Sequence, residues 1–268
     1  MDGARAESGM DGALIALACL MGLAGCSAAP VVHAARQSSV VLFDGGRQRP
    51  IAVEVYAPRE AERCTSTHAC PVALLSAGYG ISHKSYSFIA SALSDIGYLV
   101  VAVEQELPSD PALATEGDLF VARTPNWRRG AANLRFVARS MRDARPQFDW
   151  QHPVLIGHSN GGDIAAWLVR ESPDFAAALV TLDNRRVPLP RSAAPRVLSV
   201  RASDFPADTG VLPADEELRR YGTCIVSLRG ARHDDMHDGG PIALREAITN
   251  AVVAFLRDGA CGAPKSMP

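Results

Sequence analysis

Short apolar runs alternate with amphipathic segments along most of this chain, and this alternation limits the possible folds more than any other feature. From residue 71 onward, patterns typical of buried strands and of helices follow one another in turn. Strands are expected at 72–76, 98–103, 153–156, 176–182, 196–200 and 224–228, and helices at 85–96, 126–143, 160–170 and 241–256. Such alternation predicts an α/β fold with a mostly parallel central sheet and helices on both faces.

Two β-rich runs, at 40–43 and 51–56, precede the alternation, and the turn-prone Asp44-Gly45-Gly46 between them predicts an opening hairpin. The segment after the strand at 176–182 is too short to hold a large helical lid. The 268 residues are 47% apolar, which is enough to bury one full core. We therefore expect one domain over residues 40–268, preceded by a linker at 26–39.

Net charge gives no indication of a charged partner. The chain has 27 Lys and Arg against 29 Asp and Glu. Removing Asp2, Arg5, Glu7 and Asp11 with a leader would leave 26 of each sign. A neutral domain has no general attraction to nucleic acid or to an anionic membrane, so no nucleic-acid partner is expected.

The N-terminus carries a targeting signal. Residues 13–23 form a charge-free apolar run, too short for a typical membrane span, which leads into Leu23-Ala24-Gly25-Cys26. This ending resembles the lipobox of bacterial lipoproteins, which implies a signal peptide at 1–25 and a lipid on Cys26. The acidic n-region departs from the usual positive charge, and an uncleaved membrane anchor is the alternative. Both interpretations predict export, to the periplasm or the cell envelope.

Cysteine usage agrees with export. Beyond Cys19 in the leader and the expected lipid-bearing Cys26, four cysteines remain, at Cys64, Cys70, Cys224 and Cys261. An even number in an exported chain predicts disulfides, and we favour Cys64–Cys70 and Cys224–Cys261. A zinc site is the weaker alternative, because the four do not form two close CxxC pairs. No metal or organic cofactor is expected.

The segment Gly157-His158-Ser159-Asn160-Gly161 has the context of a nucleophile elbow, because an apolar strand precedes it and a helical pattern follows. Gly157 and Gly161 allow the sharp turn that lets the Ser159 hydroxyl project at the helix N-terminus, where the helix dipole stabilises negative charge. Ser159 is therefore the predicted nucleophile. His158 is expected to pack or to form hydrogen bonds below it.

A serine nucleophile needs a base, which in this arrangement follows the last strand. His233 lies directly beyond the strand expected at 224–228, and His237, further into the same loop, is the alternative. An acid that orients the histidine should lie between serine and histidine in the sequence. Asp183 and Asp204 end successive expected strands, and the residues alone leave both open.

The oxyanion of the reaction needs two backbone N–H donors. One is expected from Asn160, the residue after the nucleophile. Tyr79, in the loop after the strand at 72–76, is the candidate for the other, because glycines on both sides let its N–H point inward.

Together these segments resemble the α/β-hydrolase superfamily, and 73–237 looks like its platelet-activating-factor acetylhydrolase and dienelactone-hydrolase-like branch. The matching segments are 76–80, 97–104, 157–162, Leu182-Asp183 followed by Pro188-Leu189, and Arg229-Gly230. In the acetylhydrolases an aspartate at this place is the catalytic acid, so the resemblance favours Asp183 over Asp204. One departure is Ala77, where the family usually has histidine before glycine, and this affects the pocket rather than the backbone donor.

The resemblance implies a serine hydrolase that cleaves a small or short-acyl carboxylic ester through an acyl-enzyme on Ser159. An acyltransferase or amidase with the same triad is one alternative. A non-catalytic envelope lipoprotein that binds a ligand is another. The expected partners are a small-molecule ester and, through a lipid on Cys26, the membrane.

Overall fold

A computed structural model describes residues 36–261, so the expected signal peptide, Cys26 and most of the expected linker lie outside the described residues. The strands are β1 (Gln37–Asp44), β2 (Arg49–Tyr56), β3 (Cys70–Ser76), β4 (Leu99–Val103), β5 (Phe148–His158), β6 (Ala178–Leu182), β7 (Arg196–Arg201) and β8 (Cys224–Ser227). The helices are α1 (Ser87–Asp95), α2 (Leu119–Ala144), α3 (Asn160–Glu171), α4 (Asp215–Tyr221) and α5 (Ile242–Asp258). None of these helices is long and apolar enough to span a bilayer.

The eight strands form one sheet in the order β1-β2-β4-β3-β5-β6-β7-β8. β2 runs antiparallel to both of its neighbours. The other six strands, β4-β3-β5-β6-β7-β8 in sheet order, all pair in parallel. The predicted mostly parallel sheet with an opening hairpin is therefore confirmed. Because β3 lies between β4 and β5, the strand order reverses there, and a crevice is expected at the carboxyl ends of β3 and β5.

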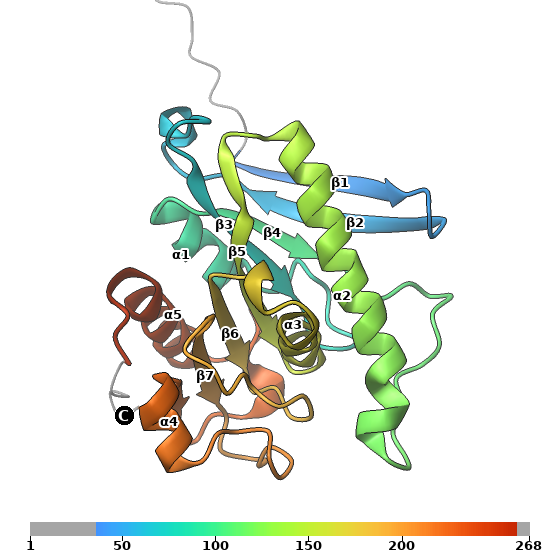
Figure 1. The fold of residues 1–268 in the computed structure, drawn as a ribbon, viewed down its shortest axis with the longest axis vertical. Helices are drawn as coiled ribbons and strands as arrows, with labels where there is room; N and C mark the ends of the chain where they lie inside the picture. The colour runs from blue at the N-terminus through green and yellow to red at the C-terminus, as the bar shows by residue number, and fades with distance from the viewer. Residues whose placement is uncertain (1–35, 262–268) are drawn as a thin grey trace, which may run out of the picture. The chain divides into compact units, whose positions relative to one another are not determined.

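Two apolar cores lie on the two faces of the sheet. Along β3, Leu74 faces one core and the next residue, Leu75, faces the other, as the alternation of a buried strand requires. The first core contains Trp127 of α2 and Ile164 of α3, and the second contains Leu93 of α1. Figure 1 shows the same division, with α2 and α3 on one face and α1 and α5 on the other.

Helix α2 begins at Leu119, earlier than the start expected at residue 126. The Asp118 side chain caps it by accepting hydrogen bonds from the N–H groups of Phe120 and Val121. Pro125 lies inside the helix, where its missing N–H removes one internal hydrogen bond without ending the helix. The loop between β4 and α2 is therefore 104–118.

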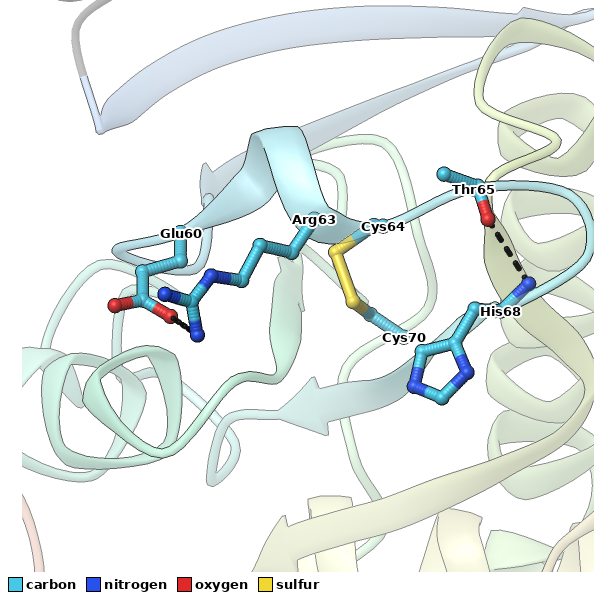
Figure 2. Close-up of a disulfide and its surroundings, with 6 residues drawn as sticks. All are labelled: Glu60, Arg63, Cys64, Thr65, His68 and Cys70. Atoms are coloured by element: carbon cyan, nitrogen blue, oxygen red, sulfur yellow. Dashed lines mark hydrogen bonds and ion pairs between the residues drawn. A yellow bond between two sulfur atoms is a disulfide. The ribbon is translucent and has the colours of Figure 1, made fainter.

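Both favoured disulfides are present. Cys64–Cys70 joins the entry of β3 to the turn before it, which a hydrogen bond of 3.0 Å from His68 N–H to Thr65 Oγ1 closes (Figure 2). Cys224–Cys261 ties the segment after α5 to the start of β8. Sulfurs bonded to each other cannot bind zinc as thiolates, so the zinc alternative was wrong. At the N-terminal side of the domain, β1 begins at Gln37, within the range 26–39 that was expected as a linker.

Candidate active site

Ser159 occupies the sharp turn between β5 and α3. Its backbone has φ 52° and ψ −120°, in the left-handed half of conformational space that a non-glycine residue rarely adopts. A Cβ atom on Gly157 would collide with the carbonyl of Gly161, and one on Gly161 would collide with the carbonyl of Ser76. The two glycines are required because β3, β5 and α3 approach so closely here.

The imidazole of His233 lies between Ser159 and Asp183. Its Nε2 is 2.8 Å from Ser159 Oγ, and its Nδ1 is 2.5 Å from Asp183 Oδ2. A carboxylate at Nδ1 holds the proton there and leaves Nε2 free to accept the serine proton. The three side chains come from the ends of β5 and β6 and from the loop after β8, and their arrangement suits general-base activation of a serine.

Asp204, the other candidate acid, contacts the main chain of the same histidine. Both of its carboxylate oxygens accept the His233 N–H, at 2.9 and 3.0 Å. His237 makes no hydrogen bond to Ser159 or to either aspartate among the described residues, and its Nδ1 accepts the N–H of Gly239 at 3.0 Å. The structure therefore brings Asp183 to the imidazole and Asp204 to the backbone that carries it.

Asp183 is fully buried and is held as a carboxylate. Arg201 Nη2 lies 2.8 Å from Asp183 Oδ1, and the N–H of Ala202 donates to the same oxygen at 3.2 Å. Burial alone would raise the pKa of Asp183, but the hydrogen bond from His233 and the charge of Arg201 outweigh it and lower the pKa. Sequence reasoning missed Arg201, although an arginine that ends an otherwise apolar strand is a usable signal.

The backbone donors expected for an oxyanion are Asn160 N–H and Tyr79 N–H. Asn160 is the first residue of α3, where no carbonyl of the preceding turn is available. In the β3–α1 loop, Gly78 N–H already donates to the Tyr86 hydroxyl at 3.0 Å. Within residues 36–261 we find no acceptor for the N–H of Tyr79 or of Asn160, so both can donate to a bound group.

The Asn160 side chain is anchored by α2, which the sequence did not indicate. Its Nδ2 donates to Asn126 Oδ1 at 2.9 Å, and its Oδ1 accepts from Trp127 Nε1 at 3.0 Å. All three residues are buried. Because both amide atoms are engaged, the side chain fixes the first turn of α3 against α2, next to the serine.

Asp163, one turn into α3, is a further residue that the sequence did not indicate. Its Oδ1 accepts the backbone N–H groups of Arg185, Arg186 and Val187, at 3.2, 2.9 and 2.9 Å. Burial raises its pKa despite these bonds. The sequence signal that could have indicated Asp163 is an acidic residue in the first turn of the helix after the elbow. In the structure, Asp163 holds the loop that begins with Asp183 against α3.

A cavity of about 570 Å³ lies beside the oxyanion loop. It is lined by residues 79–82 of that loop and, from the β4–α2 loop, by Glu104, Glu106, Leu107, Pro108, Asp110 and Pro111. The Tyr79 hydroxyl accepts the N–H of Leu113 at 3.1 Å, which ties the two loops together. This volume is in the range of small-molecule sites.

Comparison with known proteins gives a family and a fold. Residues 71–230 match the model of a family described as the alpha/beta hydrolase fold. A search of curated protein sequences finds no match.

Solved structures with a similar fold include esterase 2 of Thermogutta terrifontis, here phosphoramylated by tabun, at 15% identity and a TM-score of 0.60, over 86% of this chain and 97% of that one. A ferulic acid esterase from Streptomyces cinnamoneus is 17% identical with a TM-score of 0.55, over 82% and 88%. A serine hydrolase without a lid from Xanthomonas campestris is 18% identical with a TM-score of 0.52, over 88% and 99%. At these identities the similarity concerns the fold.

Proposed function

The chain belongs to the α/β-hydrolase fold family, and we propose that it is a serine hydrolase that cleaves carboxylic esters. The observation that carries the proposal is the continuous hydrogen-bonded series from Ser159 through His233 to Asp183. Structures of similar fold that are described as esterases, from Thermogutta terrifontis and Streptomyces cinnamoneus, support it.

In the proposed mechanism, Ser159 Oγ attacks the ester carbonyl carbon while His233 Nε2 takes the hydroxyl proton. Asp183 stays ionised and stabilises the imidazolium that forms. The N–H groups of Asn160 and Tyr79 donate to the oxyanion. The imidazolium then returns its proton to the leaving alcohol, which gives the acyl-enzyme, and a water molecule activated by His233 hydrolyses it.

We propose a small or short-acyl ester as the substrate. The connection 183–195 between β6 and β7, where a large lid would be inserted, contains no helix. The position of Asp183 after β6 supports the resemblance to the platelet-activating-factor acetylhydrolase and dienelactone-hydrolase-like branch. The cavity beside Tyr79 offers room for a compact acyl or alcohol group.

The test is hydrolysis of 4-nitrophenyl esters, from acetate to octanoate, by the full chain and by Ser159→Ala. We expect turnover that falls with acyl length and a loss of about 10³-fold or more in the variant, because the nucleophile is gone. Transfer of the acyl group to an amine or alcohol in preference to water would favour the acyltransferase alternative. A folded protein that turns over none of these esters would favour the ligand-binding lipoprotein.

We further propose that the enzyme acts outside the cytoplasm, anchored through a lipid on Cys26. Two disulfides support an oxidising compartment, and the Leu23-Ala24-Gly25-Cys26 segment supports lipid attachment. In a bacterial host, the full chain should incorporate a labelled fatty acid and partition into detergent, and Cys26→Ala should do neither. Equal labelling of both proteins would refute the anchor.

A further inference from the structure

A buried tyrosine connects the oxyanion loop to the nucleophile elbow. Tyr86 is 1% exposed and lies directly before α1. Its hydroxyl oxygen is 3.0 Å from Gly78 N and 2.8 Å from His158 Nδ1. Because an N–H group can only donate, the tyrosine oxygen accepts from Gly78 and its proton is available for His158 Nδ1.

His158 continues the connection to the loop of the catalytic histidine. Its Nε2 is 3.0 Å from the carbonyl oxygen of His233, which can only accept, so the Nε2 proton belongs to His158. Burial, and then the neighbouring charge of His233, lower the pKa of His158 to about 3. The ring is therefore neutral at physiological pH, with Nδ1 as acceptor and Nε2 as donor, which is the tautomer that both contacts require.

The main chain of His233 is thus held on both of its polar groups. Asp204 accepts its N–H, and His158 donates to its carbonyl, which also accepts a longer bond of 3.4 Å from Met236 N–H. At the other end, a Cβ on Gly78 would lie 2.9 Å from His158 Nδ1, so only glycine lets the oxyanion loop approach this closely.

We propose that Tyr86 and His158 form a positioning relay, which fixes the distance between the Tyr79 N–H of the oxyanion loop and the imidazole of His233. The proposal rests on the proposed function and adds two residues to it. All donors in the series Gly78–Tyr86–His158–His233 point the same way, an arrangement in which hydrogen bonds strengthen one another. Both side chains are buried, each 1% exposed, so we expect the relay to act on transition-state geometry and not on substrate affinity.

The first test compares Tyr86→Phe with Tyr56→Phe on 4-nitrophenyl acetate. Tyr56 is a matched control because it is also a buried tyrosine of the same core, and its hydroxyl meets only Gln37, at 3.4 Å, among the described side chains. We expect Tyr86→Phe to lower kcat by about 10-fold to 100-fold with KM within about threefold. Tyr56→Phe should keep both constants within about twofold of the wild type. Equal kcat in the two variants would overturn the relay.

Variants of His158 give a second test of the relay, which holds even if Tyr86→Phe fails to fold. His158→Leu removes both contacts, and His158→Gln keeps an acceptor and a donor, so Gln should retain more kcat than Leu at equal KM. Adding Tyr86→Phe to His158→Leu should cost little more than His158→Leu alone, because both changes break one series. Additive losses in the double variant would show two separate effects and refute a relay.

A spectroscopic arm separates the relay from the proposed function. The His233 Nδ1 proton, bonded to Asp183, should give a low-field NMR signal that is sharp in the wild type and in Tyr56→Phe. In Tyr86→Phe the signal should broaden through faster exchange with water. If the wild type hydrolyses no ester, the proposed function fails and this signal still decides the relay, since an unchanged signal in Tyr86→Phe refutes it.

Discussion

At the residue scale, two aspartates contact different parts of His233. Asp183 contacts the imidazole and is itself paired with Arg201, whereas Asp204 accepts the main-chain N–H of His233. A contact with the ring sets its tautomer and stabilises its charged form. A contact with the backbone only places it.

This division predicts different effects of the same substitution at the two sites. Asp183→Asn should lower kcat for 4-nitrophenyl acetate by about 10³-fold to 10⁴-fold, because a neutral amide neither fixes the tautomer nor stabilises the imidazolium. Asp204→Asn should cost less than about tenfold, since its amide oxygen still accepts the His233 N–H. Steady-state kinetics of both purified variants measures this, and an equal or larger loss in Asp204→Asn would reverse the assignment.

The buried His158 predicts a pH dependence of stability. Its folded pKa, about 3, lies below the ordinary value of 6.5, so the unfolded chain binds this proton more readily. Stability should therefore fall as pH drops below 6.5, by about 2 kcal/mol between pH 7 and pH 5, and the loss should end near pH 3. Urea unfolding at pH 7 and pH 5 should show a smaller drop for His158→Leu than for the wild type. Equal drops would mean that His158 is not buried in its neutral form.

At the element scale, the site depends on where helices and loops are tied to the sheet. Helix α3 carries the elbow and holds the β6–β7 loop through Asp163, and α2 holds α3 through Asn126 and Trp127. The disulfides lie outside this arrangement, at the entry of β3 and at the start of β8. Their loss should therefore affect stability more than the chemistry of the site.

The length of the loop that each disulfide closes predicts which of the two contributes more to the free energy of unfolding. Cys224–Cys261 spans a sequence separation of 37 and Cys64–Cys70 one of 6. Closing the longer loop restricts the unfolded chain more, so paired Cys→Ser variants should lose about 4 kcal/mol for Cys224–Cys261 and about 2 kcal/mol for Cys64–Cys70. Urea unfolding of the two double variants checks this order, and a larger loss at Cys64–Cys70 would contradict it.

At the scale of the whole molecule, periodic segments were predictable and distant contacts were not. The strand and helix alternation predicted the sheet, but Pro125 concealed the first turns of α2, and the short, exposed α4 has too few apolar positions to be detected. The elbow was predictable because its residues are adjacent in the sequence.

The rest of the site could not be predicted, because it depends on contacts between residues that lie far apart in the sequence. Asp183 and Asp204 end neighbouring strands, and the choice between them depends on which carboxylate reaches the ring of His233; Asp183, with φ 55°, is the one that does. Tyr86 lies 72 residues from His158, so no local pattern connects them. Such contacts form only when β3, β5 and the loop after β8 come together.

Activation of Ser159 can be tested by covalent labelling of the folded full chain with a fluorophosphonate, followed by digestion and peptide mass spectrometry. Such reagents react with a serine that its own site activates, so heat-denatured protein is the control. We expect one adduct per chain, on the peptide that contains Ser159, and none in Ser159→Ala or in the denatured protein. A folded protein that takes no label, or one labelled at another residue with Ser159 unmodified, would contradict this expectation.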